Sequence, residues 1–442
     1  MIIQQKYKRF ILCMVSAALA TTNFVNGADW TGFRGPDRDG KSAEKNLLEK
    51  WPRGGPRMLW AVQGLRKGYS SVAVANGMIY TTGLAGSEGI LSACDLNGRL
   101  KWQVAYGPEW TGPHSGARST PTVDEDRIYL ISGMGQIHCF DARGAGKWFV
   151  DTFKTFGGRN LQWGIAESPL IVDEKIIVTP GGPEAAVVAL DKLTGRTIWV
   201  TEGLDEKSAY CSPVLVEIGG QKRIVTMLEK SIVIINLENG ELLCRIPHEV
   251  QYDISAVSPL FSRAGLYVTN GYGQGGVMYE ILTQGKTYTQ KWIDKTLDCH
   301  HGGVVLVDDN IYGMSSSGKL ISLAAESGKV NYEDPGVGKG SIIYADGMLY
   351  CYEEKKGNVR LIQPAQHGFV VRGSFNMTQG DGEYWAHPAI SDGVLYLRHG
   401  DALVAYDINP YKTPIPESAA ESRYDAGSSC PNEQPPVKQL QE

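Results

Sequence analysis

The chain has 442 residues, with 43 Lys and Arg against 48 Asp and Glu and a formal net charge of −5. It contains no run of basic residues, so the composition argues against nucleic acid as a partner. A chain of this length often folds as about three domains, but an internal repeat indicates one large repeated unit instead.

Residues 1–28 are predicted to be a signal peptide. Basic residues at positions 6, 8 and 9 precede a short apolar run over 10–20, and cleavage is expected near Ala28. The run is short for a membrane span, and an uncleaved anchor is the alternative. Cys13 follows Ile and Leu rather than small residues, so we do not expect a lipidated cysteine. We expect an exported protein, periplasmic or secreted, with no stable membrane span after cleavage.

Residues 29–56 are rich in turn-forming residues and are expected to wrap around the domain that follows. Asp37-Arg38-Asp39-Gly40 resembles part of a calcium loop but lacks the later ligands. We therefore expect a turn at this point.

Between residues 57 and 407 one pattern recurs: short alternating apolar runs, separated by turns and ending in an aromatic residue. The clearest copy spans 168–199. The copies are anchored at spacings between 38 and 49 residues on Val72, Pro121, Pro169, Pro213, Pro259, Val304, Ile342 and Pro388. Such a period, with several short strands per unit, is typical of a β-propeller. The sequence predicts an all-β, eight-bladed β-propeller of four-stranded antiparallel blades.

The last copy lacks a fourth strand, because prolines follow its third apolar run at 402–407. Residues 57–63 resemble a fourth strand with no first three before it. We expect this N-terminal strand to complete blade eight and so to close the ring without free strand edges. Residues 408–442 hold clustered prolines among polar residues and are predicted to be a disordered tail.

Cysteine usage gives no sign of a disulfide framework. Eight cysteines occur, one of them in the predicted signal peptide. The others form neither an adjacent pair nor a Cys-x-x-Cys motif, and their number is odd. We expect most of them to be small buried hydrophobic residues.

The segment Ala189-Leu190-Asp191-Lys192-Leu193-Thr194-Gly195-Arg196-Thr197-Ile198-Trp199 resembles the repeat of pyrroloquinoline-quinone-type (PQQ-like) propellers, and weaker copies lie near Trp102, Trp148 and Gly240. The chain is also similar to exported bacterial PQQ-binding-like propellers, through 29–36, 300–305, 338–341 and 385–388. The resemblance implies that the closing Trp of each repeat packs between blades beside a glycine turn.

The same resemblance covers enzymes and scaffolds. Quinoprotein dehydrogenases of this fold are expected to hold PQQ with calcium, using a stacking Trp, an Arg and acidic or amide ligands, often with a vicinal cysteine disulfide. This chain has no vicinal cysteine pair. Related non-enzymatic propellers include the scaffold lipoprotein of outer-membrane protein assembly. The resemblance therefore leaves the cofactor open, with PQQ and calcium as a candidate pair.

The repeat phase predicts where a site would form. Residues just before each innermost strand meet at one mouth of the central channel, and the loops beside them share that face. Convergent polar and aromatic groups around a concavity are the usual form of a binding site. The candidate binding residues at this channel mouth are His114, Arg118, Trp163, Glu167, Tyr210, His300, His301, Lys339, Trp385 and His387.

Each candidate has a structural alternative. His300 and His301 point to opposite faces of a strand, so they are poorly placed to share a metal ion, and we predict no metal site. Arg118 either pairs with Glu167 or, with Lys339, holds an anionic group. The two tryptophans either stack on a sugar or flat cofactor or pack between blades. The histidines at 114 and 387 are candidates for surface hydrogen bonding.

One further motif is set aside. Gly271-Tyr272-Gly273-Gln274-Gly275-Gly276 has no helix after it, so it is a turn rather than a dinucleotide loop.

The leading functional hypothesis is a non-catalytic scaffold that binds a small molecule, glycan or protein at the channel mouth. The first alternative is a PQQ-dependent alcohol or sugar dehydrogenase with Glu167 on calcium. The second is a polysaccharide hydrolase or lyase using His300, His301, Tyr210 and Glu167.

Overall fold

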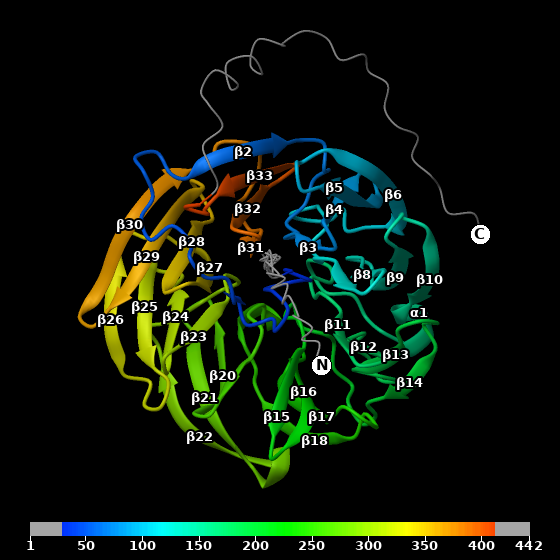
Figure 1. Ribbon diagram of the computed structural model, residues 1–442. Coiled ribbons are helices and arrows are strands. Elements are labelled where there is room, and N and C mark those ends of the chain that lie inside the picture. The colour runs from blue at the N-terminus through cyan, green and yellow to red at the C-terminus, as the bar shows by residue number, and fades with distance from the viewer. Residues whose placement is uncertain (1–28, 412–442) are drawn as a thin grey trace, which may run out of the picture.

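The computed structural model describes residues 29–411. Within this range the strands form eight sheets arranged as blades around one axis (Figure 1). The prediction of an eight-bladed, all-β propeller is thus confirmed. The predicted signal peptide and all but the first residues of the predicted tail lie outside the described residues.

The blades follow one another in chain order, each with its first strand innermost. Blades one to four contain β3 (Ala73–Ala75), β4 (Met78–Ala85), β5 (Glu88–Asp95), β6 (Leu100–Pro108); β7 (Thr122–Asp124), β8 (Arg127–Ile131), β9 (Gln136–Asp141), β10 (Gly146–Asp151); β11 (Leu170–Val172), β12 (Lys175–Val178), β13 (Val188–Asp191), β14 (Thr197–Val200); β15 (Val214–Ile218), β16 (Gln221–Met227), β17 (Ser231–Asn236) and β18 (Leu242–Pro247). Blades five to eight contain β19 (Leu260–Ser262), β20 (Gly265–Asn270), β21 (Gly275–Leu282), β22 (Thr287–Asp294); β23 (Val304–Val307), β24 (Asn310–Met314), β25 (Lys319–Ala324), β26 (Val330–Pro335); β27 (Gly340–Ala345), β28 (Met348–Glu353), β29 (Asn358–Ala365), β30 (Gly368–Asn376); β31 (Ala389–Ser391), β32 (Val394–His399), β33 (Ala402–Asp407) and β2 (Arg57–Val62). The helical elements are α1 (Thr152–Phe156), η1 (Gln251–Asp253) and η2 (Thr283–Gly285).

The ring closes through the N-terminal strand, as predicted. β2 pairs antiparallel with β33, with Ala61 opposite Val404 and Arg57 opposite Asp407. The Arg57 guanidinium lies 2.6 Å from the Asp407 carboxylate. Because β2 is the outermost strand of blade eight, the two ends of the repeat region share one sheet and leave no seam between blades.

The closing tryptophans pack between blades, as the resemblance implied. Trp148 of blade two donates from its indole nitrogen to the Lys192 carbonyl of blade three at 3.2 Å, and its ring lies against Gly195. Trp199 makes the same hydrogen bond, at 2.9 Å, to the Leu237 carbonyl of blade four. A large rigid ring beside a glycine fills the space between two twisted sheets.

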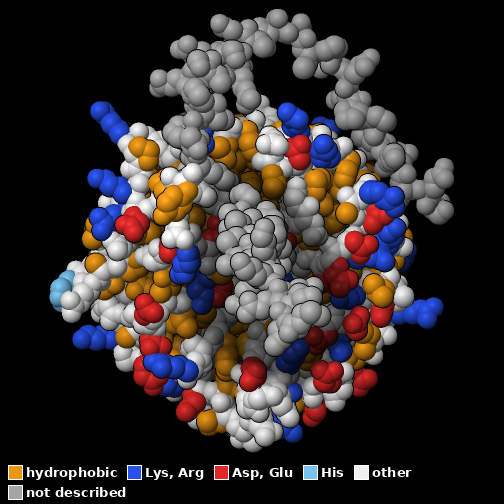
Figure 2. Space-filling view, viewed as in Figure 1, with side chains coloured by type: hydrophobic (Ala, Val, Ile, Leu, Met, Phe, Trp, Pro, Cys, Tyr) orange, Lys and Arg blue, Asp and Glu red, His pale blue; other side chains and the backbone are white. Residues whose placement is uncertain are grey.

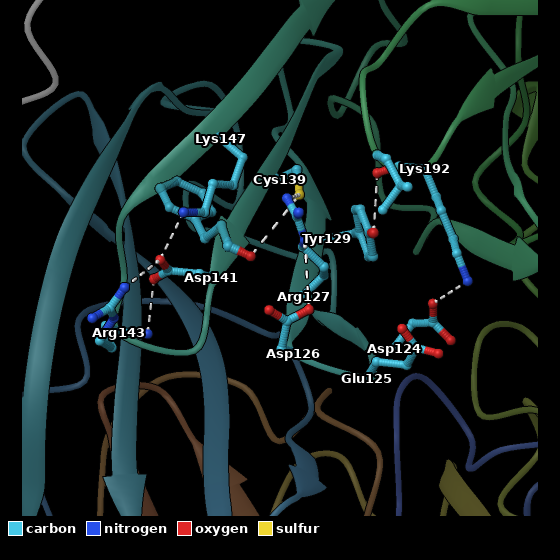
Figure 3. A network of polar contacts seen from close by, with 12 residues as sticks. Asp124, Glu125, Asp126, Arg127, Tyr129, Cys139, Asp141, Arg143, Lys147 and Lys192 are labelled. Carbon is cyan, nitrogen blue, oxygen red and sulfur yellow. Dashed lines mark hydrogen bonds and ion pairs between the residues drawn. The ribbon is translucent and has the colours of Figure 1, made fainter.

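Polar contacts accompany this packing between blades two and three (Figure 3). The Tyr129 hydroxyl donates to the Lys192 carbonyl at 3.1 Å, and the Lys192 ammonium reaches Asp124 at 2.8 Å. Asp141 binds Lys147 at 2.9 Å on the outer side of blade two. The turn of one blade is therefore fastened to the body of the blade before it.

The N-terminal segment, defined here as residues 29–56, crosses the centre of the ring before it reaches β2 (Figure 1). Its strand β1 (Lys41–Ser42) pairs parallel with β27, which gives blade seven a fifth strand that the repeat did not predict. Trp30 exchanges backbone hydrogen bonds with Val74 of blade one. The segment thus links blades one and seven, which lie on either side of blade eight.

The described surface and interior agree with a compact ring without disulfides. The described cysteines are all buried and free. In residues 29–411 no helix is both long and apolar enough to cross a bilayer. In Figure 2, Lys and Arg side chains are interspersed with Asp and Glu side chains over the visible surface of the blades.

Candidate functional site

Most of the predicted mouth residues meet at one rim of the channel. Tyr69 and Arg118 precede the inner strands β3 and β7, and Tyr210 precedes β15. The histidines at 300 and 301, Lys339 and Trp385 precede β23, β27 and β31 in the same way. Equal phase in the repeat therefore places them side by side, although they are hundreds of residues apart in sequence.

The rim carries a continuous row of aromatic and imidazole rings. Trp385 lies at its centre, with ring centroids 4.8 Å from Tyr69, 5.0 Å from His114 and 5.8 Å from His301. The row continues from His301 to His300 at 5.2 Å and from His300 to Tyr272 at 4.8 Å. Trp385 and Tyr69 are half-buried, whereas Tyr272 is exposed. These rings form a surface on which an apolar or flat group could rest.

A charged cluster supports this row from within. The Glu354 carboxylate accepts from the His301 Nε2 at 2.7 Å and lies 3.1 Å from the Lys339 ammonium. Although burial opposes its ionisation, these two partners lower the pKa of Glu354 to about 2. The Lys339 ammonium also donates to His300 Nδ1 at 2.9 Å. Since an ammonium only donates, His300 accepts at Nδ1 and is neutral, and burial, with His301 and Lys339, lowers its pKa to about 3.

Arg118 is a cation of the rim that forms no ion pair with a described carboxylate. Its guanidinium donates to the carbonyl oxygens of Gly116 at 2.9 Å and His114 at 2.5 Å. It lies over the Tyr69 ring, 5.4 Å from the centroid. No ion pair of Arg118 with Glu167, or with another carboxylate, occurs within residues 29–411. Burial lowers its pKa, and the surrounding tyrosines and glutamates partly offset this effect.

Trp163 and Tyr210 form a second aromatic pair beside Arg118. Their ring centroids are 6.0 Å apart, and both side chains are half-buried. Burial raises the pKa of Tyr210 to about 12, so its hydroxyl stays protonated at neutral pH. The pair extends the rim toward blades three and four.

Glu167 does not lie at the open rim. Its side chain is 0 % exposed, and one carboxylate oxygen accepts from the Thr179 amide at 2.8 Å. Burial raises its pKa to about 7, while Thr179 and Arg38 act in the opposite direction. The N-terminal segment supplies Arg38 and covers this region, so Glu167 is enclosed rather than presented to a ligand.

His387 is also buried and separates the rim from the N-terminal segment. Its Nε2 faces the His301 carbonyl at 3.0 Å and its Nδ1 faces an Arg34 nitrogen at 3.3 Å. Because the carbonyl only accepts and the guanidinium only donates, His387 is neutral with its hydrogen on Nε2. Burial and Arg34 accordingly hold its pKa well below the usual value. This histidine fixes the His301 backbone and does not reach the surface.

Sequence reasoning missed three rim residues, and two of them follow from the same topology. Glu354 and Tyr272 lie in turns between the second and third strands of their blades, which share the face of the inner-strand entries. That rule could have found both. Glu383, which lies 3.4 Å from His114 and accepts from the Tyr69 hydroxyl at 3.1 Å, belongs to an irregular loop between blades seven and eight. The phase of the repeat does not predict a residue of the rim at this position.

The donor set at the rim does not fit a calcium-bound quinone. The expected calcium ligand Glu167 is enclosed and directed to Thr179. Among residues 29–411 no three His, Cys, Asp or Glu side chains are grouped to hold a metal ion. Glu354 is occupied by His301 and Lys339. What the rim offers is aromatic surface, one guanidinium without a carboxylate partner, and a histidine–glutamate hydrogen bond.

The fold and this rim define a class: an eight-bladed propeller with PQQ-like repeats. The family model described as outer membrane protein assembly factor BamB matches residues 87–334, more than half of the chain. The chain belongs to this family. No curated protein matches the sequence.

Solved structures share the fold at low sequence identity. BamB from Moraxella catarrhalis aligns with a TM-score of 0.58 and 15% identity over 81% of this chain and 99% of its own. The computationally designed Ika8 protein aligns with a TM-score of 0.58 and 11% identity, over 80% of this chain and 100% of its own. A quinohemoprotein alcohol dehydrogenase from Pseudomonas putida reaches a TM-score of only 0.41 at 13% identity, over 88% of this chain and 82% of its own. These likenesses describe the fold and do not choose a function.

Proposed function

We propose that the chain is a non-catalytic interaction scaffold of an exported compartment, and that its rim holds a segment of a protein partner. The observation that carries the proposal is the row of rings from Tyr69 through Trp385 and His301 to Tyr272, next to Arg118. Trp, Tyr and Arg are the side chains most enriched among energetically dominant interface residues. The family description, an assembly factor, agrees with a protein partner.

The charge pattern of the rim supports binding without catalysis. Lys339, Glu354 and His301 satisfy one another, and His300 accepts from Lys339. Groups already paired in this way need no ligand to complete them, and they hold the aromatic row in place. Arg118 is left to contact an acidic or carbonyl group of the partner.

The test is a binding assay with a library of extended peptides rich in aromatic and acidic residues. Trp385→Ala and Arg118→Ala should each weaken the best binder about tenfold or more. Phe149→Ala is the matched control, because Phe149 is exposed on the outer strand β10, away from the rim. Equal loss in the control, or binding of a glycan array in place of peptides, would contradict the proposal.

A second candidate is acid–base chemistry on a polysaccharide. The specific observation is the 2.7 Å contact between His301 Nε2 and Glu354, in which a carboxylate could orient an imidazole for proton transfer. Glu354 replaces Glu167 in this role. Turnover of a polysaccharide that His301→Ala abolishes would establish this activity, and it would displace the scaffold proposal.

A quinone cofactor has a direct test as well. Adding PQQ and calcium to the purified chain should produce no stoichiometric absorbance band, because the rim lacks the expected ligands. A bound chromophore with dye-linked alcohol oxidation would reverse that conclusion.

A further inference from the structure

One buried side chain of the N-terminal segment contacts three blades at once. The Arg34 side chain is only 3% exposed. One of its guanidinium nitrogens donates to the Val304 carbonyl of blade six at 2.6 Å. The other donates to the Ile342 carbonyl of blade seven and to His387 Nδ1, just before blade eight, both at 3.3 Å. A single planar guanidinium, with its donors in a fixed fork, therefore joins three neighbouring blades.

The groups that Arg34 contacts lie directly below part of the rim. They come two or three positions after the rim residues of the same blades, which are His301, Lys339 and Trp385. Trp385 and His301 belong to the row of rings, and Lys339 belongs to the charged cluster that supports it. Because a strand residue advances only about 3.3 Å, a short stretch of backbone separates the guanidinium from each of the three.

A path of hydrogen bonds leads from Arg34 to the rim. Since a guanidinium only donates, His387 accepts at Nδ1 and donates from Nε2 to the His301 carbonyl at 3.0 Å. The His301 ring is in turn bonded to Glu354 at 2.7 Å. Phe33 packs against the His387 ring in a T-shaped contact, with centroids 5.0 Å apart. The position of His301 therefore depends on how the N-terminal segment is bound.

The backbone around Arg34 is shaped to admit its guanidinium. Gly303, between His301 and Val304, has φ 74°, and Gly40 has φ 78°. A Cβ at either position would overlap a guanidinium nitrogen of Arg34. Burial lowers the pKa of Arg34 to about 10, although Asp39 and Cys299 oppose this shift, so the group is charged at neutral pH. The guanidinium is thus a fixed, ionised part of the ring.

The same contact brings together sequence segments that are far apart in the chain. Residues 29–36, 300–305 and 385–388 carry the resemblance to PQQ-binding-like propellers, and each supplies one member of the contact: Arg34, Val304 and His387. Ile342 directly follows the fourth such segment, residues 338–341. These segments therefore form one structural unit beneath the rim.

We infer that Arg34 is the positioning residue of the rim, and that through it the N-terminal segment sets the affinity of the rim for its partner. This inference rests on the proposed function, because it concerns the same row of rings. With Arg34 bound, the entries of blades six, seven and eight keep the spacing at which His301, Lys339 and Trp385 form one surface. Such preorganisation lowers the entropic cost of binding.

The test compares Arg34→Lys with the matched control Arg38→Lys in the full chain. Arg38 belongs to the same segment and is 8% exposed, and its two terminal nitrogens donate to the Ser168 and Pro169 carbonyls of blade three at 2.6 and 2.7 Å. Lysine has one terminal nitrogen and cannot replace two. Both variants should lose thermal stability. Because blade three contributes no ring to the row, only Arg34→Lys should weaken the best rim-binding peptide, by about tenfold.

A second measurement needs no partner. The Nε2 resonance of His301 in NMR reports the hydrogen bond of this ring with Glu354. It should shift in Arg34→Lys and stay in place in Arg38→Lys. His387→Phe keeps a ring against Phe33 but removes both hydrogen bonds of the histidine, so it should shift the resonance and lower the peptide affinity as Arg34→Lys does.

The outcomes separate this inference from the proposed function. An unchanged His301 resonance in Arg34→Lys would overturn the inference, and so would equal peptide affinities of Arg34→Lys and Arg38→Lys. If no peptide binds the wild type, the proposed function fails, and the His301 resonance alone decides whether Arg34 positions the rim. If Arg34→Lys does not fold, His387→Phe is compared with Arg38→Lys in its place.

Discussion

Single side chains at the rim owe their protonation states to what surrounds them. Lys339 contacts both Glu354 and His300, so one ammonium stabilises a carboxylate and at the same time keeps an imidazole neutral. His300 and His301 are adjacent in sequence, yet one accepts from a lysine and the other donates to a glutamate. The chemistry available at each ring therefore follows from its partner and not from its residue type.

Lys339→Met tests this division of roles. The pKa of His300 is lowered to about 3 by burial first and by His301 and Lys339 next. Removing the ammonium should raise this pKa, which should nevertheless stay below 6.5 because burial is unchanged. NMR titration of the ring protons measures it. Lys355→Met, an exposed lysine, is the control, and an unchanged pKa in Lys339→Met would contradict the argument.

Glu167→Gln tests the cost of the enclosed carboxyl. The folded-state pKa is raised to about 7 from 4.5, so the folded state holds its proton more tightly, and stability falls as pH rises from about 4.5 to 7. Glutamine cannot ionise. The variant should gain stability relative to the wild type over that window, by at most about 3 kcal/mol. Chemical denaturation at pH 5 and 8 measures this gain. Glu241→Gln, at an exposed position, should show no comparable gain.

At the scale of strands and turns, the structure of the repeat unit explains why glycine occurs in the turn before the fourth strand. In blades one to six the turn before the fourth strand contains a glycine with positive φ, and in blade three Gly195 has φ 73°. A side chain there would also meet the neighbouring Trp148 ring, since an added Cβ would lie 2.7 Å from it. Backbone conformation and packing between blades thus impose glycine at the same position.

Gly195→Ala and Gly77→Ala separate these two effects. Both glycines have φ 73°, but nothing lies within 4 Å of a Cβ added at Gly77. Gly77→Ala should cost only the backbone strain, about 1 kcal/mol, whereas Gly195→Ala should cost about 1–3 kcal/mol more through overpacking against Trp148. Thermal unfolding of both variants measures the difference. Equal melting temperatures would show that the contact with Trp148 does not contribute to the cost of Gly195→Ala.

The same elements show what the sequence could predict. Period and alternation were sufficient for eight blades and for closure through β2. They were also sufficient for the rim positions of Arg118, Trp385 and the two adjacent histidines, because these depend on repeat phase. The enclosed states of Glu167 and His387 depend on the N-terminal segment, whose residues 29–40 lie outside any repeat. The insertion of Arg34 and Arg38 into the ring is a tertiary event that no local pattern marks.

At the scale of the whole molecule, contacts between distant segments hold the ring. β2 joins the two ends of the repeat region, and the N-terminal segment bonds to blades one, three, six and seven from the centre. Buried or half-buried histidines with lowered pKa values lie at several of the junctions. His138 in blade two and His387 before blade eight are buried, whereas His248 before blade five and His300 before blade six are half-buried. They make the ring as a whole sensitive to acid.

We expect the free energy of unfolding to fall as pH drops below about 6.5. Burial lowers the pKa of His138 to about 4 and that of His300 to about 3, and the pKa values of His248 and His387 are lowered too. Each neutral histidine makes its full contribution to stability above its unfolded-state pKa of 6.5. That contribution is lost as pH falls toward the folded-state pKa. Glu167 acts in the opposite direction between about 4.5 and 7, and so does Glu109, whose pKa burial also raises. Two carboxyls offset only part of the stability that protonation of four histidines removes.

His138→Phe tests how much one histidine contributes to the loss of stability in acid. His138 lies among Tyr106, Phe140 and Phe149, and its Nε2 has no hydrogen-bond partner, so a phenyl ring suits the site. Between pH 6.5 and 4 the free energy of unfolding of the variant should fall by about 3 kcal/mol less than that of the wild type, because phenylalanine takes up no proton. Melting temperatures across that range measure this. An acid dependence as steep as that of the wild type would mean that His138 takes up its proton in the folded ring.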